Sequence, residues 1–149
     1  MIFVVQMIII ALSSCGFTLA YYIHITKKTE SKLVCPLEGN CEAVVHSDYS
    51  KLFNIHLEVI GMFYYLTVGL LYTFFAFAPG LLPLFMSYGV IGVCLTAFLF
   101  SVYLTFIQAF ILKHWCTWCL FSAGISTIIF ILTLYTSNSK VVELFQNLF

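Results

Sequence analysis

The sequence contains no arginine, and only 8% of its 149 residues carry a charged side chain. Its six lysines are balanced by six acidic residues. This leaves none of the basic excess that marks nucleic-acid-binding proteins. Hydrophobic residues make up 62% of the chain, which is more apolar surface than a soluble domain can bury. The composition therefore indicates an integral membrane protein.

Charged residues are absent from three long stretches, residues 1–26, 59–112 and 114–139. A transmembrane helix needs about 20 apolar residues, so the stretches have room for one, two and one helices. We expect four spans, at about residues 2–25, 58–77, 84–110 and 115–135. The expected fold is an all-α, four-transmembrane-helix bundle. We expect residues 1–149 to form a single membrane domain, with no thioredoxin-like domain.

Two shorter helices are expected at the membrane surfaces. Between the first two spans, Ser47 is a suitable N-cap and is followed by apolar residues at helical spacing, namely Tyr49, Leu52 and Phe53. They predict a short amphipathic helix on the extracytoplasmic surface. The tail from residue 140 has the same spacing and predicts a second surface helix on the inner leaflet. His56 and Glu58, at the outer end of the second span, are expected to be solvated there.

Four of the six cysteines form two pairs near membrane boundaries, Cys35 with Cys41 and Cys116 with Cys119. With four spans, the loop after the first and the loop before the fourth lie on the same face, so the pairs can meet. Disulfide chemistry places that face outside the cytosol. Most lysines also lie on that face, which conflicts with the positive-inside rule. We therefore base the expected orientation in the membrane on the cysteines. Cys15 and Cys94 fall within spans and are expected to be structural.

The Cys-x2-Cys pair stands at the start of the fourth apolar segment. In a helix, Cys116 and Cys119 at i and i+3 share one face of the first turn. Unpaired backbone N–H groups and the helix dipole stabilise a thiolate there. The only tryptophans, Trp115 and Trp118, lie at the same boundary, where indole rings favour the interface. The motif predicts a redox-active dithiol at the membrane surface.

Three interpretations of the four cysteines are open. A zinc site with four cysteine ligands is one, although the Cys-x5-Cys half is outside the usual spacing. Two structural disulfides in a non-enzymatic membrane protein are another, although a bridge within a helical turn is strained and labile. The third is a disulfide relay, which needs an electron acceptor. Reduction of a quinone by the purified protein with a dithiol donor would separate the relay from the other two.

A quinone dissolved in the bilayer is the simplest acceptor, since no motif for flavin, haem or a nucleotide is recognisable. Its site needs an apolar slot with few polar groups. We expect this slot beside Cys119, lined by residues of the second and fourth spans: Ile60, Tyr64, Tyr65, Trp118 and Ser122.

The order of these motifs resembles the vitamin K epoxide reductase family in its small bacterial form. The matching residues are Cys35 and Cys41, Ser47, Lys51-Leu52-Phe53, Gly61-Met62-Phe63-Tyr64-Tyr65, and Trp115-Cys116-Thr117-Trp118-Cys119. They cover nearly the whole chain.

The resemblance implies a role for each cysteine. Cys35 would take electrons from a thioredoxin-like partner, Cys41 would exchange with Cys116, and Cys119 would face a quinone of the ubiquinone or menaquinone type. Ser47 would match a polar serine near the active site. No metal is implied. The expected function is disulfide formation in exported proteins, at the cytoplasmic (inner) membrane of a prokaryote, with the active site on the extracytoplasmic face.

Two departures bear on the substrate. Animal members of the family have an asparagine at the position of Leu57 and a tyrosine at that of Ala123, and both bind the quinone by hydrogen bonds. Because neither is present here, we expect reduction of a quinone rather than of an epoxide.

Overall fold

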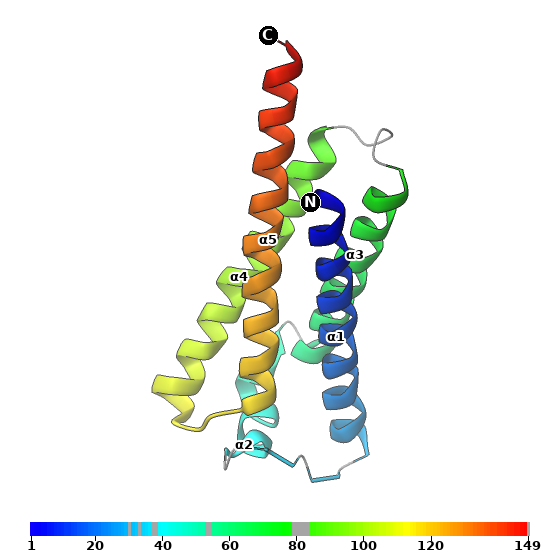
Figure 1. The fold of residues 1–149 in the computed structure, drawn as a ribbon. Coiled ribbons are helices and arrows are strands. Elements are labelled where there is room, and N and C mark those ends of the chain that lie inside the picture. Colours follow the sequence, from blue (N-terminus) through cyan, green and yellow to red (C-terminus); the bar gives the residue numbers. More distant parts are fainter. Residues whose placement is uncertain (30, 33, 37–38, 53–54, 79–83, 149) are drawn as a thin grey trace.

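Four long helices form the body of the protein (Figure 1). They are α1 (Ile2–Lys28), α3 (Leu57–Phe77), α4 (Leu84–Phe106) and α5 (Thr117–Leu148). The computed structural model describes the chain except residues 30, 33, 37–38, 53–54, 79–83 and 149, and it describes no side chains at 50, 52, 84 and 140–148. Each long helix is long and apolar enough to cross a membrane. The all-α, four-span fold predicted from the charge-free stretches is confirmed.

Both cysteine-bearing loops lie at the same end of the bundle (Figure 1). The loop between α1 and α3 contains α2 (Cys41–Val45), the 3₁₀ turn η1 (Asp48–Ser50), and strands β1 (Lys51–Leu52) and β2 (Ile55–His56). The strands pair antiparallel as a two-residue ladder. At the end of α4, the π-helical turn η2 (Ile107–Leu112) precedes a left-handed residue, Lys113, with φ 51°. That residue turns the chain toward α5.

The predicted surface helix after Ser47 is wrong in position. A short helix does lie between the first two spans, but it is α2, whose first turn is capped by Asn40 Oδ1 accepting from the Ala43 N–H at 3.3 Å. The Ser47 hydroxyl donates back to the Val44 carbonyl at 2.7 Å instead of capping a new helix. Only one 3₁₀ turn follows, because Lys51 and Leu52 pair with His56 and Ile55. Phe53 lies outside the described residues.

The predicted tail helix also differs from the structure. The tail is helical to Leu148, but it continues α5 without a break (Figure 1). No proline or glycine stands between residues 125 and 148 to end the helix. The tail is therefore not a separate helix on the inner leaflet.

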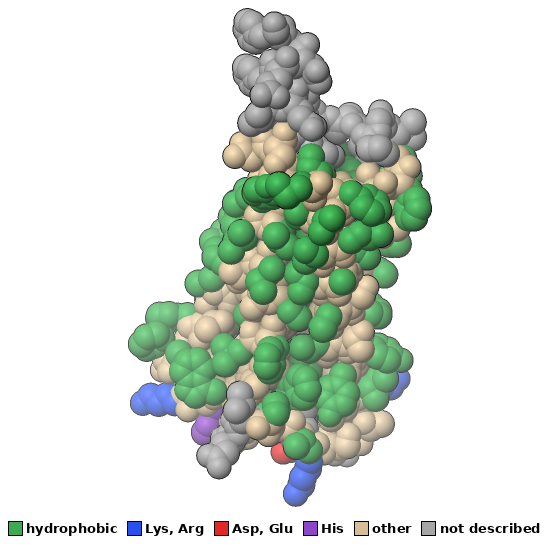
Figure 2. Space-filling model, viewed as in Figure 1, with side chains coloured by type: hydrophobic (Ala, Val, Ile, Leu, Met, Phe, Trp, Pro, Cys, Tyr) green, Lys and Arg blue, Asp and Glu red, His purple; other side chains and the backbone are tan. Residues whose placement is uncertain are grey.

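Apolar side chains cover the length of the visible bundle face, whereas the visible lysine, acidic and histidine side chains gather at the loop end (Figure 2). This is the distribution expected for a protein surrounded by lipid. Inside, Ile9, Val68, Cys94 and Ile129 join the four helices in one core. Some of the buried hydroxyl groups find partners there. Tyr72, for example, donates to the Thr133 hydroxyl at 2.9 Å.

Helices α1 and α3 are in tight contact at Gly16. A Cβ atom there would lie 2.5 Å from the Tyr65 ring. The ring has little freedom to move, because the Tyr65 hydroxyl bonds the Ser122 carbonyl at 2.9 Å and the Ser126 hydroxyl at 3.1 Å. This contact fixes one wall of the cavity described below.

We expect Gly16→Ala to destabilise the protein, because overpacking a close contact costs about 1–3 kcal/mol. Gly61→Ala is the matched control on the same interface, since its Cβ would lie 3.8 Å from Ala20. The control should be neutral or slightly stabilising, because alanine is the better helix former. Thermal unfolding in detergent would measure both changes. Equal unfolding temperatures for the two variants would contradict the close contact.

Candidate functional site

The loop cysteines are joined. Cys35 and Cys41 form a disulfide with a Cα–Cα distance of 6.0 Å, within the range that a bridge requires. Cys41 is the first residue of α2 and is almost fully buried, whereas Cys35 is half-buried. Cys35 is therefore the more accessible end of the bridge.

The cysteines of the second pair are both free thiols in the structure. Helix α5 begins one residue later than the motif suggests, so Cys116 precedes it and its carbonyl accepts from the Leu120 N–H at 3.0 Å. That is the N-cap position. The Cys119 N–H points back to the Cys116 sulfur at 3.3 Å, as third-residue N–H groups do toward an N-cap side chain. The sulfur therefore lies where a helix best stabilises negative charge.

A second group, on η2, holds Cys116. The Cys116 N–H donates to Gln108 Oε1 at 3.4 Å, and both residues are buried. Sequence reasoning did not give Gln108 a role at the site. The feature that could have indicated such a role is the amide side chain within a membrane span, where leaving a polar group unpaired costs free energy.

The two cysteine pairs come together in one buried cluster at the loop end. Cys41 and Cys116 belong to this cluster with Ile23, Val44 and Val45, and Cys35 and Cys119 pack against it. The neighbours on α1 and α2 are apolar, and bulk water is excluded around the sulfurs of Cys41 and Cys116. The arrangement can support exchange between the pairs.

Trp118 ties the loop to α5. Its indole N–H donates to the Val34 carbonyl at 3.0 Å, next to Cys35, and its ring contacts Tyr22 at 5.4 Å between centroids. This hydrogen bond joins residues 84 positions apart in the sequence. It holds the segment before the loop disulfide beside the Cys-x2-Cys motif.

The surroundings of Cys116 favour its thiolate. Its pKa is lowered by the hydrogen bond with the Cys119 side chain and by the N–H groups of Cys119 and Trp118, which together outweigh the opposite effect of burial. The thiolate is the form that attacks a disulfide.

We therefore expect Cys116 to react with a small alkylating reagent at a pH where an ordinary thiol, with a pKa of about 8.5, is still protonated. The rate should fall only as the pH drops through the lowered pKa. Cys119→Ala removes the largest cause of the shift, so its alkylation profile should move to higher pH. Mass spectrometry of alkylated peptides, with the loop cysteines replaced by serine, would measure both profiles. Identical profiles would contradict the role of Cys119.

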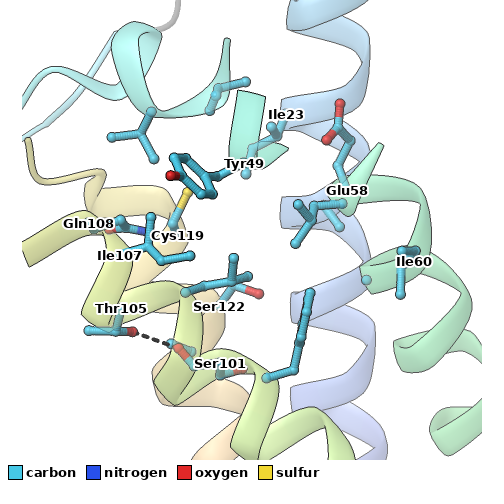
Figure 3. Close-up of a pocket in the computed structure, with 18 of the residues that line it drawn as sticks. Ile23, Tyr49, Glu58, Ile60, Ser101, Thr105, Ile107, Gln108, Cys119 and Ser122 are labelled. Atoms are coloured by element: carbon cyan, nitrogen blue, oxygen red, sulfur yellow. Dashed lines mark hydrogen bonds between the residues drawn. The ribbon is translucent and has the colours of Figure 1, made fainter. Parts of the chain in front are cut away.

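A cavity of about 200 Å³ opens beside Cys119, between all four long helices and the loop (Figure 3). Four of the residues expected around a quinone line this cavity, namely Ile60, Tyr64, Tyr65 and Ser122. Ser47 lines it as well. Trp118 does not, because its indole is directed to the loop carbonyl.

The cavity is suited to a flat apolar group with a few polar atoms. A dry cavity of about 150 Å³ already holds benzene, so the space fits a substituted ring but not a long isoprenoid tail as well. Its lining residues are mostly aliphatic and aromatic, and the polar ones include Gln108, Ser122 and Glu58. No cluster of three metal-binding side chains occurs among the described residues.

Glu58 is not solvated, contrary to the expectation from its place at a span end. Its carboxylate pairs with Lys27 of α1, with 3.3 Å between Oε1 and Nζ. The acidic side chain is 6% exposed and the basic one 11%. An ion pair is thus buried at the edge of the cavity.

The comparison with known families agrees with the order of motifs. The sequence pattern of the vitamin K epoxide reductase family matches residues 7–134, which include both cysteine pairs and most of the four spans. No individual curated protein matches the chain. The chain therefore belongs to the vitamin K epoxide reductase family of membrane thiol–disulfide oxidoreductases.

Proposed function

We propose that the protein passes electrons from a thioredoxin-like partner to a membrane quinone, and so drives disulfide formation in exported proteins. Cys35 and Cys41 receive the electrons, and Cys116 and Cys119 deliver them. The observation that carries the proposal is the shared buried cluster of Cys41 and Cys116, with Cys119 on the wall of an apolar cavity.

The exchange begins at the accessible end of the loop bridge. A partner thiolate attacks Cys35 and releases Cys41 as a thiolate, and the partner's second thiol then displaces Cys35, so that the loop pair is reduced. Cys41 attacks Cys116 of an oxidised Cys116–Cys119 bridge and releases Cys119. Cys35 then attacks Cys41, which restores the loop bridge and frees Cys116. The Cys116–Cys119 pair, now reduced, carries the two electrons.

The final step takes place in the cavity. Oxidation of Cys116 and Cys119 to a disulfide supplies two electrons to the quinone, whose two oxygens take up two protons. Ile60, Tyr64 and Tyr65 line the space for the ring, and Ser122 offers it a hydroxyl group. Ser47 lines the same space from the loop.

We also propose that the loop end faces the extracytoplasmic side of the cytoplasmic membrane of a prokaryote. Disulfide chemistry requires an oxidising compartment, and both cysteine pairs lie at that end. A cysteine introduced at Ser31, in a background without native cysteines, should react with an impermeant maleimide in intact cells. If a cysteine introduced at Ser139 reacts instead, the orientation is opposite to the one proposed.

Quinone reduction by the purified protein tests the proposal. With a dithiol donor and a short-chain ubiquinone or menaquinone, we expect catalytic formation of the quinol. A Cys116→Ala variant should show only the background rate. Absence of quinol formation by the unaltered protein, with both quinones, would instead support a protein with structural disulfides.

A further inference from the structure

The buried ion pair between Lys27 and Glu58 has no role in the steps described so far. Lys27 lies in the last turn of α1 and Glu58 in the first turn of α3. Burying two charges costs several kcal/mol per ion before their attraction is counted, so a buried pair is weak evidence for stability. An apolar pair could join the two helices at this position. The charges therefore point to another use.

Glu58 has the right place for chemistry in the cavity. It lines the same space as Cys119 and lies on the opposite side of it, beside α1 (Figure 3). The other titratable side chains that line the space are Tyr49 from η1 and Tyr64 and Tyr65 from α3. Among the described residues that line the space, Glu58 is the only one with a carboxylate.

The proton balance of the proposed reaction leaves one proton to be supplied. This step rests on the proposed function. When Cys116 reacts as a thiolate and Cys119 as a thiol, the pair releases two electrons but only one proton. A quinone needs two protons, one at each oxygen, and the oxygens lie at opposite ends of the ring. A ring with one oxygen near Cys119 turns the other toward the side of Glu58.

We propose that the Lys27–Glu58 pair relays the second proton from external water to the quinone. The Glu58 carboxylate takes a proton from the Lys27 ammonium group and gives it to the far oxygen of the ring. One N–H bond breaks and one O–H bond of the quinol forms, while Glu58 returns to its carboxylate form. Lys27, at the wet end of α1, regains its proton from water.

Ordinary acidities make this transfer feasible. A quinol is a phenol, and the phenol of tyrosine has a reference pKa of about 10, close to about 10.4 for lysine. A proton can therefore pass between them with little change in free energy. The carboxylate between the two accepts the proton on one oxygen and, as a transient carboxylic acid, donates it from that O–H group.

Two variants separate proton relay from a merely structural ion pair. Glu58→Gln keeps the shape of the side chain but cannot carry a proton. Lys27→Arg keeps the ion pair, but arginine does not release its proton. Glu42→Gln and Lys28→Gln are the matched controls, because both residues are exposed and lie at the same end of the protein.

The experiment measures the two half-reactions separately. In the first, the thiol pairing of Cys116 and Cys119 is followed after addition of a dithiol donor without quinone. In the second, pre-reduced protein is mixed with a short-chain ubiquinone and quinol formation is followed. We expect Glu58→Gln and Lys27→Arg to slow the second by about 10²-fold, the lower end of the range for general acid catalysis. The first should be unchanged, and both controls should match the unaltered protein.

The pH dependence gives the sharpest readout. Without the relay the proton must come from solvent, so the quinone step of Glu58→Gln should accelerate as the pH falls, down to the pH at which the Cys116 thiolate itself becomes protonated. An unaltered quinone step in either variant would overturn the relay. So would equal slowing of both half-reactions without recovery at low pH, which would indicate a structural role. If the unaltered pre-reduced protein fails to reduce the quinone, the proposed function itself is wrong.

Discussion

A protein without Cys35 and Cys119 is expected to hold a stable disulfide between Cys41 and Cys116 and to lose catalytic quinone reduction. Cys41 and Cys116 lie in one buried cluster. In the double variant Cys35→Ala/Cys119→Ala, neither thiol that could resolve the mixed bridge remains. The bridge should form on mild oxidation and persist, and turnover should fall to the background rate. Mass spectrometry of non-reduced peptides would identify it.

The complementary pair of cysteines provides the control. Cys41→Ala/Cys116→Ala leaves Cys35 at the outer end of the loop bridge and Cys119 on the cavity wall. These two should remain free thiols under the same conditions. A bridge between Cys35 and Cys119 would mean that the assignment of inner and outer cysteines is wrong. If neither variant forms a bridge between the two pairs, the relay itself is wrong.

Filling the cavity should weaken quinone binding without touching the exchange of disulfides. Ala123 lies one helical turn after Cys119 and lines the cavity. We expect Ala123→Leu to raise the KM for a short-chain quinone by about tenfold, because steric overfilling costs about 1–3 kcal/mol. The rate at which a dithiol reduces the Cys116–Cys119 bridge should not change. Steady-state kinetics with each substrate varied in turn would separate the two effects.

The neighbouring residue is a matched control for that substitution. Gly124 is exposed, and a Cβ atom there meets no atom within 4 Å. Gly124→Leu therefore adds its bulk toward lipid, and its KM for quinone should equal that of the unaltered protein. If both variants raise this KM equally, the effect comes from α5 as a whole and the cavity is not the quinone site.

Composition alone predicted the membrane helices. Uncharged stretches long enough to cross the bilayer become α1, α3, α4 and α5, because lipid leaves an apolar chain few alternatives to a helix. The Cys-x2-Cys spacing likewise predicted two sulfurs at the start of a helix. The helix begins at Thr117, one residue after Cys116. Such features depend on neighbours within a few positions in the sequence.

The segment after Ser47 was misplaced because two local patterns compete there. Its apolar spacing resembles that of a helix, but Lys51 and Leu52 pair with His56 and Ile55 a few positions later, and the Ser47 hydroxyl bonds back to the Val44 carbonyl. The contact of Trp118 was missed for a different reason, because its partner, the Val34 carbonyl, lies 84 positions away in the sequence. No local pattern predicts that partner.

The same limit applies to the residues around the cavity. Glu58 meets a lysine 31 positions earlier in the chain, and Gln108 reaches Cys116 across the turn between α4 and α5. Each of them stood at or within an apolar span. An ionisable or amide group in such a place is a signal of function, but the partner emerges only from the packing of the helices.

The most direct measurement of the relay is the pairing of Cys116 and Cys119 before and after a quinone is added. Pre-reduced protein would be mixed with a short-chain quinone, quenched with an alkylating reagent and mapped by mass spectrometry. We expect a Cys116–Cys119 disulfide to form in step with one quinol per protein. If both thiols stay alkylatable while quinone is in excess, or if the disulfide forms equally without quinone, electrons do not leave the protein through this pair.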